Sequence, residues 1–140
     1  MDVDHSDPCS NQASNADTRE CYLKNETRAN AEADALAQEI ASRFRESARK
    51  AIDGPVVAQC DRKAANALER SQQAWKAYRT QYCKALMYRD TTGSAAGTEF
   101  EGCMFALAQR RTQELQSDFE NFVDEPQRDS STENRTPGST

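Results

Sequence analysis

One stretch of the sequence decides the fold, because its aromatic residues recur at helical spacing. It reads Gln72-Gln73-Ala74-Trp75-Lys76-Ala77-Tyr78-Arg79-Thr80-Gln81-Tyr82-Cys83. Tyr78, Arg79 and Tyr82 follow Trp75 at three, four and seven positions, so they share one surface of a helix with it. Trp and Tyr on an apolar stripe are mostly packing residues. The stretch therefore predicts a helix whose aromatic face is in the core, with Arg79 bonded to backbone or stacked over a ring.

The same periodicity continues on both sides of this stretch. Lys, Arg and Gln fill the other faces, as expected for an amphipathic helix. The helix is predicted to end near Arg89 or Asp90. Its predicted inner stripe consists of Val57, Cys60, Ala64, Leu68, Ser71, Trp75, Tyr78, Tyr82 and Leu86.

A preceding helix is predicted from about Asp17 or Thr18. The segment Asp53-Gly54-Pro55 should stop it, because Gly tolerates a non-helical φ and Pro cannot continue the hydrogen-bond ladder. Its apolar stripe consists of Ala29, Ala33, Leu36, Ile40, Phe44, Ala48 and Ile52.

A third helix is predicted after the small residues 91–97. Thr98 and Glu101 have the spacing of a capping box, which would open this helix at Thr98. Its apolar residues are Phe100, Cys103, Met104, Leu107, Leu115, Phe119 and Phe122.

Length and composition agree with an all-α protein of one domain. The chain has 140 residues, of which 36% are hydrophobic and 29% charged, with only five Gly and four Pro. Three long helices with short connections favour an antiparallel three-helix bundle. We expect an N-terminal arm over residues 1–17, the helical bundle domain over 18–123, and a disordered tail over 124–140, which lacks apolar residues.

Helical geometry separates the five cysteines. In an up-down-up bundle Cys9, Cys21, Cys83 and Cys103 gather at one end, while Cys60 lies 23 residues before Cys83, about 35 Å away along the helix. A disulfide cannot bridge that distance. We favour the pairs Cys9–Cys21 and Cys83–Cys103 because each closes a short loop, although swapped pairs at the same end are also compatible. Cys60 is expected to be a free, buried thiol, with an intermolecular bridge as the alternative.

The charge pattern and the residue types argue against several function classes. A net charge of −5, with basic and acidic residues interleaved, does not suit a nucleic-acid binder. The one histidine, His5, lies in the arm without a rigid partner, and phosphate loops and nucleophile elbows are missing from the sequence. We therefore expect no enzyme activity, no metal site and no cofactor.

The cysteine content also suggests where the protein acts. Five cysteines in 140 residues, none in a CxxC pair, are typical of an oxidising compartment. The sequence has no apolar run of the length that spans a bilayer, and its first residues lack the features of a signal peptide. We expect the trimmed mature form of an exported protein, in the periplasm or at the cell surface.

Several motifs follow one another in a fixed order. They comprise Cys9, Cys21, Ala33, Asp34, Leu36, Gln72, Trp75, Tyr78, Arg79, Cys83, Gly93, Ser94, Cys103, Leu107, Arg111 and Leu115. With these residues the chain resembles the LprI-like lysozyme-inhibitor family over about residues 9–119. Thr80 and Thr92 stand where the family pattern has Asp and Gly, and Cys60 is additional.

The resemblance implies an all-helical exported domain that binds protein and, in some members, inhibits lysozyme. We therefore expect an acidic inhibitor that docks on a basic muramidase. The connection between Cys83 and Cys103 is the candidate for insertion into the enzyme, with Asp90, Gly93, Ser94, Glu99 and Glu101 as partner-binding residues. The motif residues Gln72, Trp75, Tyr78, Arg79 and Arg111 are expected to be structural.

Two alternatives remain open at the level of sequence. The protein could be an immunity or adaptor protein that neutralises another secreted toxin through a helix face. It could also be a structural module of the cell envelope. The sequence does not indicate the oligomeric state.

Overall fold

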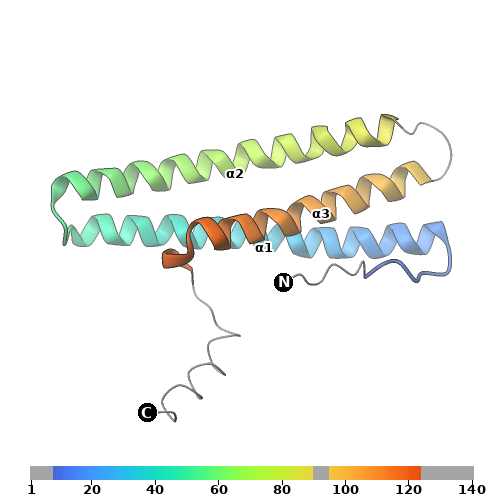
Figure 1. Ribbon diagram of the computed structural model, residues 1–140, viewed down its shortest axis with the longest axis horizontal. Helices are drawn as coiled ribbons and strands as arrows, with labels where there is room; N and C mark the ends of the chain where they lie inside the picture. Colours follow the sequence, from blue (N-terminus) through green and yellow to red (C-terminus); the bar gives the residue numbers. More distant parts are fainter. Residues whose placement is uncertain (1–7, 90–94, 124–140) are drawn as a thin grey trace, which may run out of the picture.

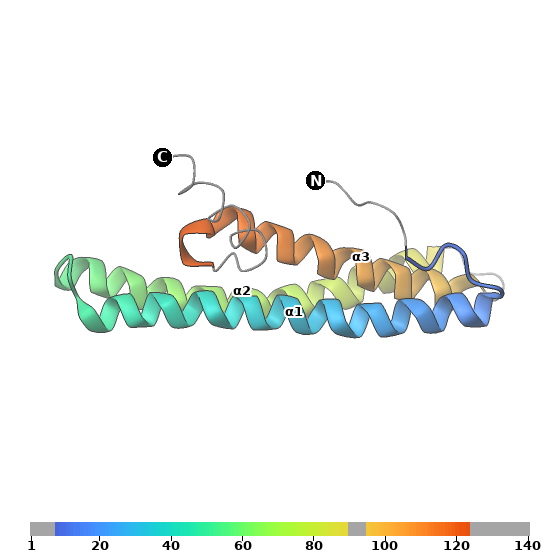
Figure 2. The same ribbon diagram turned by 90° about the horizontal axis from the view of Figure 1, so that it is seen from below.

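The computed structural model describes residues 8–89 and 95–123, and nearly all of them are helical. Helices α1 (Asn15–Lys50) and α2 (Pro55–Arg89) form a long antiparallel hairpin. Helix α3 (Ala95–Asp118) runs back along them and ends in the short 3-10 helix η1 (Glu120–Phe122). Figures 1 and 2 show this up-down-up order, which confirms the predicted three-helix bundle.

Local capping sets both ends of α1. Ser14 accepts a hydrogen bond from the Asp17 backbone N–H at 3.1 Å, so the helix begins at Asn15, slightly before the predicted start. At the other end Ala51 adopts a left-handed conformation with φ 51°, and Gly54 has φ 96°. Pro55 opens α2, where its missing N–H is not needed.

The predicted capping box at the start of α3 is wrong. The helix begins at Ala95, so Thr98 lies inside it and its hydroxyl donates to the Asn15 carbonyl oxygen at 3.5 Å. A capping residue would need a non-helical backbone, whereas Ala95 and Ala96 have the highest helix propensity of any residue type. Glu101 is a buried side chain of this helix.

Two apolar clusters form the core. Alanines contribute much of both, which lets the helices approach closely. The cluster near the middle of α1 contains Ala37, Ile40, Ala41, Ala65, Leu68 and Leu115, with Phe44, Phe119 and Phe122 packed against it. The second contains Ala29, Phe105 and Ala108, with Tyr22 and Trp75 alongside.

The buried face of α2 is rotated from the predicted stripe. Val57, Tyr78 and Tyr82 are exposed, because the next residue in each case, Ala58, Arg79 and Cys83, occupies the interior instead. The two tyrosine rings stack on each other outside the bundle, with centroids 5.5 Å apart. The buried residues of α2 are Ala58, Ala65, Leu68, Gln72, Arg79 and Cys83.

Both predicted disulfides are confirmed. Cys9 bonds to Cys21 and Cys83 bonds to Cys103, with Cα atoms 5.7 and 5.6 Å apart. The first bridge ties the turn before α1 to that helix, and the second joins α2 to α3. Cys60 is free as predicted, but it is exposed, so the expectation of a buried thiol is wrong. The same rotation of α2 places it outside.

Within the described residues, no helix combines the length and the apolar character needed to cross a membrane.

Candidate functional site

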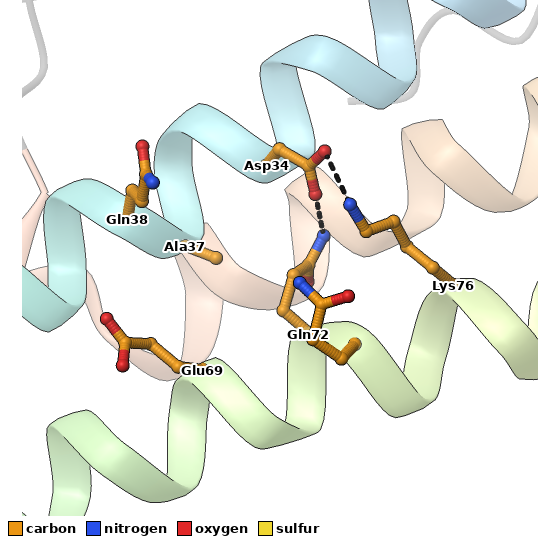
Figure 3. A pocket seen from close by; sticks show the side chains of 7 residues that line it. Asp34, Ala37, Gln38, Glu69, Gln72 and Lys76 are labelled. Carbon is orange, nitrogen blue, oxygen red and sulfur yellow. Dashed lines mark hydrogen bonds and ion pairs between the residues drawn. The ribbon is translucent and has the colours of Figure 1, made fainter.

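A network of polar side chains joins all three helices near the middle of the bundle. The Gln72 amide nitrogen donates to Asp34 Oδ1 at 2.8 Å, and its amide oxygen accepts from Arg111 Nε at 2.9 Å. Gln72 is 4% exposed and Arg111 is 8% exposed. The buried Gln72 amide therefore binds a charged side chain of α1 through its nitrogen and one of α3 through its oxygen. Figure 3 shows Gln72 reaching toward Asp34.

The two charged side chains that bind Gln72 each have a partner of opposite charge at the edge of the network. Lys76 Nζ lies 3.0 Å from Asp34 Oδ2, across the gap between α2 and α1. Arg111 also donates to Ser71 Oγ at 3.0 Å and to Glu114 Oε1 at 2.9 Å. The Arg111 guanidinium is thus held on three sides, which suits its planar set of donors.

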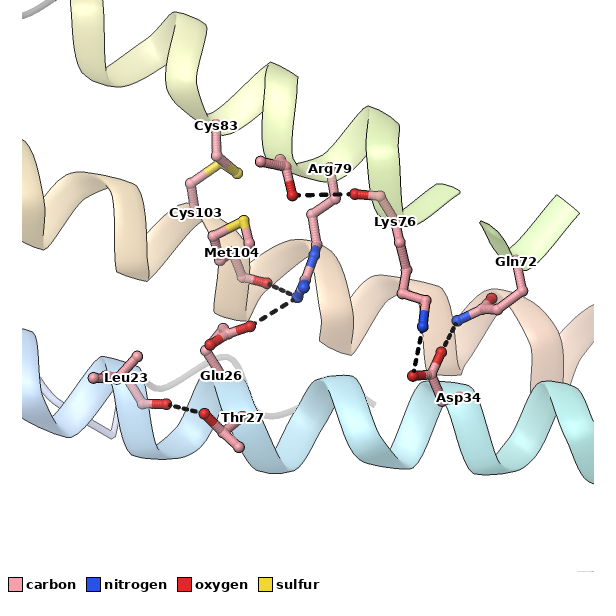
Figure 4. A network of polar contacts seen from close by, with 11 residues as sticks. Leu23, Glu26, Thr27, Asp34, Gln72, Lys76, Arg79, Cys83, Cys103 and Met104 are labelled. Carbon is pink, nitrogen blue, oxygen red and sulfur yellow. Dashed lines mark hydrogen bonds and ion pairs between the residues drawn. A yellow bond between two sulfur atoms is a disulfide. The ribbon is translucent and has the colours of Figure 1, made fainter. Parts of the chain in front are cut away.

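A second buried arginine lies nearer the disulfide end, as Figure 4 shows. Arg79 is 5% exposed. Its Nη1 forms an ion pair with Glu26 Oε2 at 3.2 Å and donates a hydrogen bond to the Met104 carbonyl oxygen at 3.3 Å. These contacts tie α2 to α1 and α3 at once. The Trp75 ring lies 5.1 Å from the Arg79 guanidinium and 5.7 Å from that of Arg111, so it connects the two clusters through cation–π contacts.

Glu101 belongs to this second cluster. Its side chain is 9% exposed. Burial raises the pKa of the Glu101 carboxyl above its usual value, and the negative charge of Glu26 adds to the rise, while Arg19 and Arg79 oppose it.

A groove between α1 and α2 opens beside the network, with a cavity of about 370 Å³. Its lining offers carboxylates, amides and one ammonium group, which suit hydrogen bonding to a polar ligand or partner. Glu69 at its edge is held by Arg45 at 2.6 and 2.8 Å, and these hydrogen bonds lower the pKa of the Glu69 carboxyl. The lining residues, drawn in Figure 3, are Asp34, Ala37, Gln38, Glu69, Gln72, Gln73 and Lys76.

None of the groove residues is a histidine, cysteine or serine. Over residues 8–89 and 95–123, no group of three or more His, Cys, Asp or Glu side chains is arranged to hold a metal ion.

A match with a known protein family shows to which family the chain belongs. The model of a family described as "Lysozyme inhibitor LprI" matches residues 9–115. The chain belongs to this family. No curated protein and no solved structure matched the chain.

The structure brings together most of the motif residues of this LprI family member. Gln72, Trp75, Arg79 and Arg111 are in contact through the two clusters. Tyr78 does not join them, because its side chain is 53% exposed on the outer face of α2.

Of the predicted partner-binding residues, Asp90, Gly93 and Ser94 lie outside the described residues. Glu99 is on the first turns of α3, where its carboxylate accepts a hydrogen bond from Arg89 Nη2 at 3.1 Å. Glu101 is buried in the Arg79 cluster. A role of these residues in partner binding stays a prediction.

The acidic partners of the buried arginine and glutamine were not predicted from the sequence. Asp34 was recognised only as a residue of the family motif, and Glu26 was assigned no role. Their positions carried a signal, since Glu26 precedes Ala29 by three residues and Ala33 by seven, which places it beside the apolar stripe.

Proposed function

We propose that this protein inhibits a lysozyme-type muramidase by docking on it. The observation that carries the proposal is the family match over residues 9–115, which includes α1, α2, most of α3 and both disulfides. An inhibitor of this kind acts by occupying the enzyme, so it requires a rigid surface and no reactive group. The buried polar network and the two disulfides supply that rigidity.

We further propose that the disulfide end of the bundle contacts the enzyme, through the connection between α2 and α3. The Cys83–Cys103 bridge joins the two helices beside this connection, so its ends are held in place. Its sequence includes Asp90, Gly93 and Ser94, and Glu99 follows it on α3. Carboxylates suit a basic enzyme surface, and the net charge of −5 favours association with a cationic partner.

We place this activity in the periplasm or at the cell surface. The two disulfides support that location, because such bonds persist in oxidising compartments. Muramidases act on the cell wall outside the cytoplasm, so inhibitor and target would share a compartment.

The docking end is tested by lysis of peptidoglycan with a fixed amount of lysozyme and increasing oxidised protein. We expect Asp90→Ala/Glu99→Ala to raise the half-inhibitory concentration at least tenfold, since even one charged pair at an interface contributes on the order of 1.5 kcal/mol or more. The matched control is Glu46→Ala/Asp53→Ala, which removes two charges at the opposite end. Inhibition unchanged by the first variant would reject this docking end and leave the inhibitor proposal standing.

A second candidate is an immunity or adaptor role through a helix face. Tyr78 and Tyr82 support it, because their stacked rings are 53% and 43% exposed on α2 and exposed tyrosines are enriched at protein interfaces. Under this candidate, Tyr78→Ala/Tyr82→Ala abolishes capture of a secreted toxin, while lysozyme lysis is unaffected by the wild-type protein. Inhibition of lysozyme by the wild-type protein would count against it.

A further inference from the structure

The hairpin of α1 and α2 extends beyond the third helix. Leu115 of α3 and the following Phe119 and Phe122 pack beside Ile40 and Phe44 in the middle of the hairpin. Figures 1 and 2 show α1 and α2 continuing together past the end of α3. We define the hairpin tip as residues 46–63. Over this segment the fold has two helices where the rest of the bundle has three.

Large aliphatic side chains gather at this tip. Ile52 is 81% exposed, Val56 is 74% exposed and Val57 is 42% exposed. Two helices alone bury only their facing residues, and here those are Ala48 and Ala58, each 4% exposed. Among the described residues, Leu23 is the one other large aliphatic side chain with comparable exposure. The exposed aliphatic surface is therefore concentrated at this end of the hairpin, whereas the exposed aromatic residues Tyr78, Tyr82 and Tyr88 lie on α2 toward the other end.

The turn that presents these side chains is well defined. The Ala51 N–H donates to the Ser47 carbonyl at 3.0 Å, and the Gly54 N–H donates to the Ala51 carbonyl at 3.1 Å. Turns of this kind usually carry polar residues, because their side chains face water. Ile52 in this turn and Val56, the second residue of α2, give the apex an apolar character that the core of the bundle does not use.

The tip also differs from the rest of the chain in charge. It holds four basic and three acidic residues, a net charge of +1, whereas the whole chain carries −5. Arg62 and Lys63 are exposed on α2, and Arg49 and Lys50 are exposed on α1, where both form ion pairs with Glu46. The other acidic residues of the tip are Asp53 and Asp61. Basic side chains beside an aliphatic apex are complementary to a surface that is anionic outside and apolar beneath.

The size of the exposed apolar surface at the tip favours a lipid bilayer over a protein as the binding partner. A stable protein interface buries about 800 Å² on each partner and uses about 20 to 30 residues on each side. Three aliphatic side chains at the end of a hairpin fall well short of that, whether the partner is a second copy or another protein. A bilayer requires less, because each aliphatic group gains individually when it enters the acyl boundary.

From these features we infer that the hairpin tip docks on an anionic phospholipid bilayer. Ile52, Val56 and Val57 enter the boundary between headgroups and acyl chains, and Lys50 and Lys63 lie among the headgroups. The 35 residues of α2 rise about 52 Å, so the Cys83–Cys103 end would be held far from the bilayer. If the proposed function holds, this orientation presents the inhibitory end to enzymes in the surrounding space.

The inference is tested by co-sedimentation of the oxidised full chain with vesicles of phosphatidylcholine and phosphatidylglycerol. We expect binding that falls at least tenfold in Ile52→Ser/Val56→Ser, since two aliphatic side chains leave the contact. The matched control is Leu23→Ser, which removes an exposed aliphatic side chain at the opposite end and should bind as the wild type does. No vesicle binding by the wild type, or an equal loss in both variants, would overturn the inference.

Charge and location are tested separately. Lys50→Glu/Lys63→Glu should weaken binding to the phosphatidylglycerol vesicles and leave helicity unchanged. Cys60, the free and exposed thiol, lies one helical turn from Val56 and can carry an environment-sensitive fluorophore. Its emission should shift to shorter wavelength with these vesicles, and an unchanged emission would place the tip in water and overturn the inference.

Size-exclusion chromatography tests whether the tip binds a second copy of the protein instead of a bilayer. If the wild type elutes as a dimer in size-exclusion chromatography and Ile52→Ser/Val56→Ser elutes as a monomer, the tip is a dimer contact and the bilayer inference is overturned. The lysis assay contains no vesicles. A lack of lysozyme inhibition would therefore reject the proposed function, whereas a lack of vesicle binding would reject only the bilayer inference.

Discussion

The Arg79 guanidinium lies 3.2 Å from the Glu26 carboxylate, with side chains that are 6% and 12% exposed. Arg79 also donates to the Met104 carbonyl oxygen, so this one side chain fixes α2 against both other helices. A buried charge that loses its partner keeps its desolvation penalty. The ion pair therefore makes the bundle intolerant of change at either position.

Glu26→Ala is expected to lower the free energy of unfolding by about 3 to 5 kcal/mol, because Arg79 stays buried without its ion-pair partner. Urea unfolding followed by circular dichroism measures this change. Glu20→Ala is the control, since Glu20 is exposed on the same helix and its loss should cost less than about 0.5 kcal/mol. Replacing the pair, as in Glu26→Leu/Arg79→Met, should recover most of the loss. Equal stability of Glu26→Ala and the wild type would contradict this role.

Gln72→Ala is expected to destabilise the protein by about 1 to 3 kcal/mol, because Arg111 and Asp34 each lose a buried hydrogen-bond partner. The neighbouring Gln73 is exposed, so Gln73→Ala provides a matched control with the same chemical change. Chemical unfolding of the two variants side by side checks the prediction. Similar midpoints for both would show that the buried amide does not hold the network.

Removing the Cys83–Cys103 bridge as Cys83→Ser/Cys103→Ser should cost about 3 kcal/mol, from the entropy that the closed loop removes from the unfolded chain. The Cys9–Cys21 bridge closes a shorter loop and should cost slightly less. Thermal unfolding of the two double variants tests the order. A larger loss for the Cys9–Cys21 variant would show that the turn before α1 contributes packing beyond chain entropy.

Glu101→Gln is expected to stabilise the protein at neutral pH. The pKa of Glu101 is raised in the folded state, mainly by burial, so the folded protein takes up this proton at higher pH than the unfolded chain does. Protonation thus adds stability as the pH falls from the raised pKa toward the usual value. The advantage of Glu101→Gln should shrink over that range, and unfolding curves at several pH values measure it. A constant advantage would assign the effect to something other than titration.

The sequence was sufficient to predict the elements and their order. The stop at Gly54-Pro55 and the short loops closed by each pair of cysteines are local features, so three helices and both disulfides follow from them. The start of α3 was misplaced because Thr98 has the spacing of a cap, whereas helix propensity extends the helix back to Ala95.

The inner face of α2 was harder to predict, because hydrophobicity alone selected it. Tyr78 and Tyr82 have the spacing of core residues, but Gln72 and Arg79 take the interior once Asp34 and Glu26 supply partners from α1. A buried polar residue cannot be recognised until its partner on another helix is known. The same reason explains why Glu101 was assigned to a partner surface although it lies inside.

Inhibition of lysozyme by the oxidised protein tests the central claim most directly. Peptidoglycan lysis by several lysozyme types is followed while the protein is titrated, first oxidised and then after reduction of both disulfides. We predict stoichiometric inhibition of at least one lysozyme type by the oxidised protein and loss of that inhibition on reduction. A correctly folded, oxidised protein that inhibits none of them would contradict it.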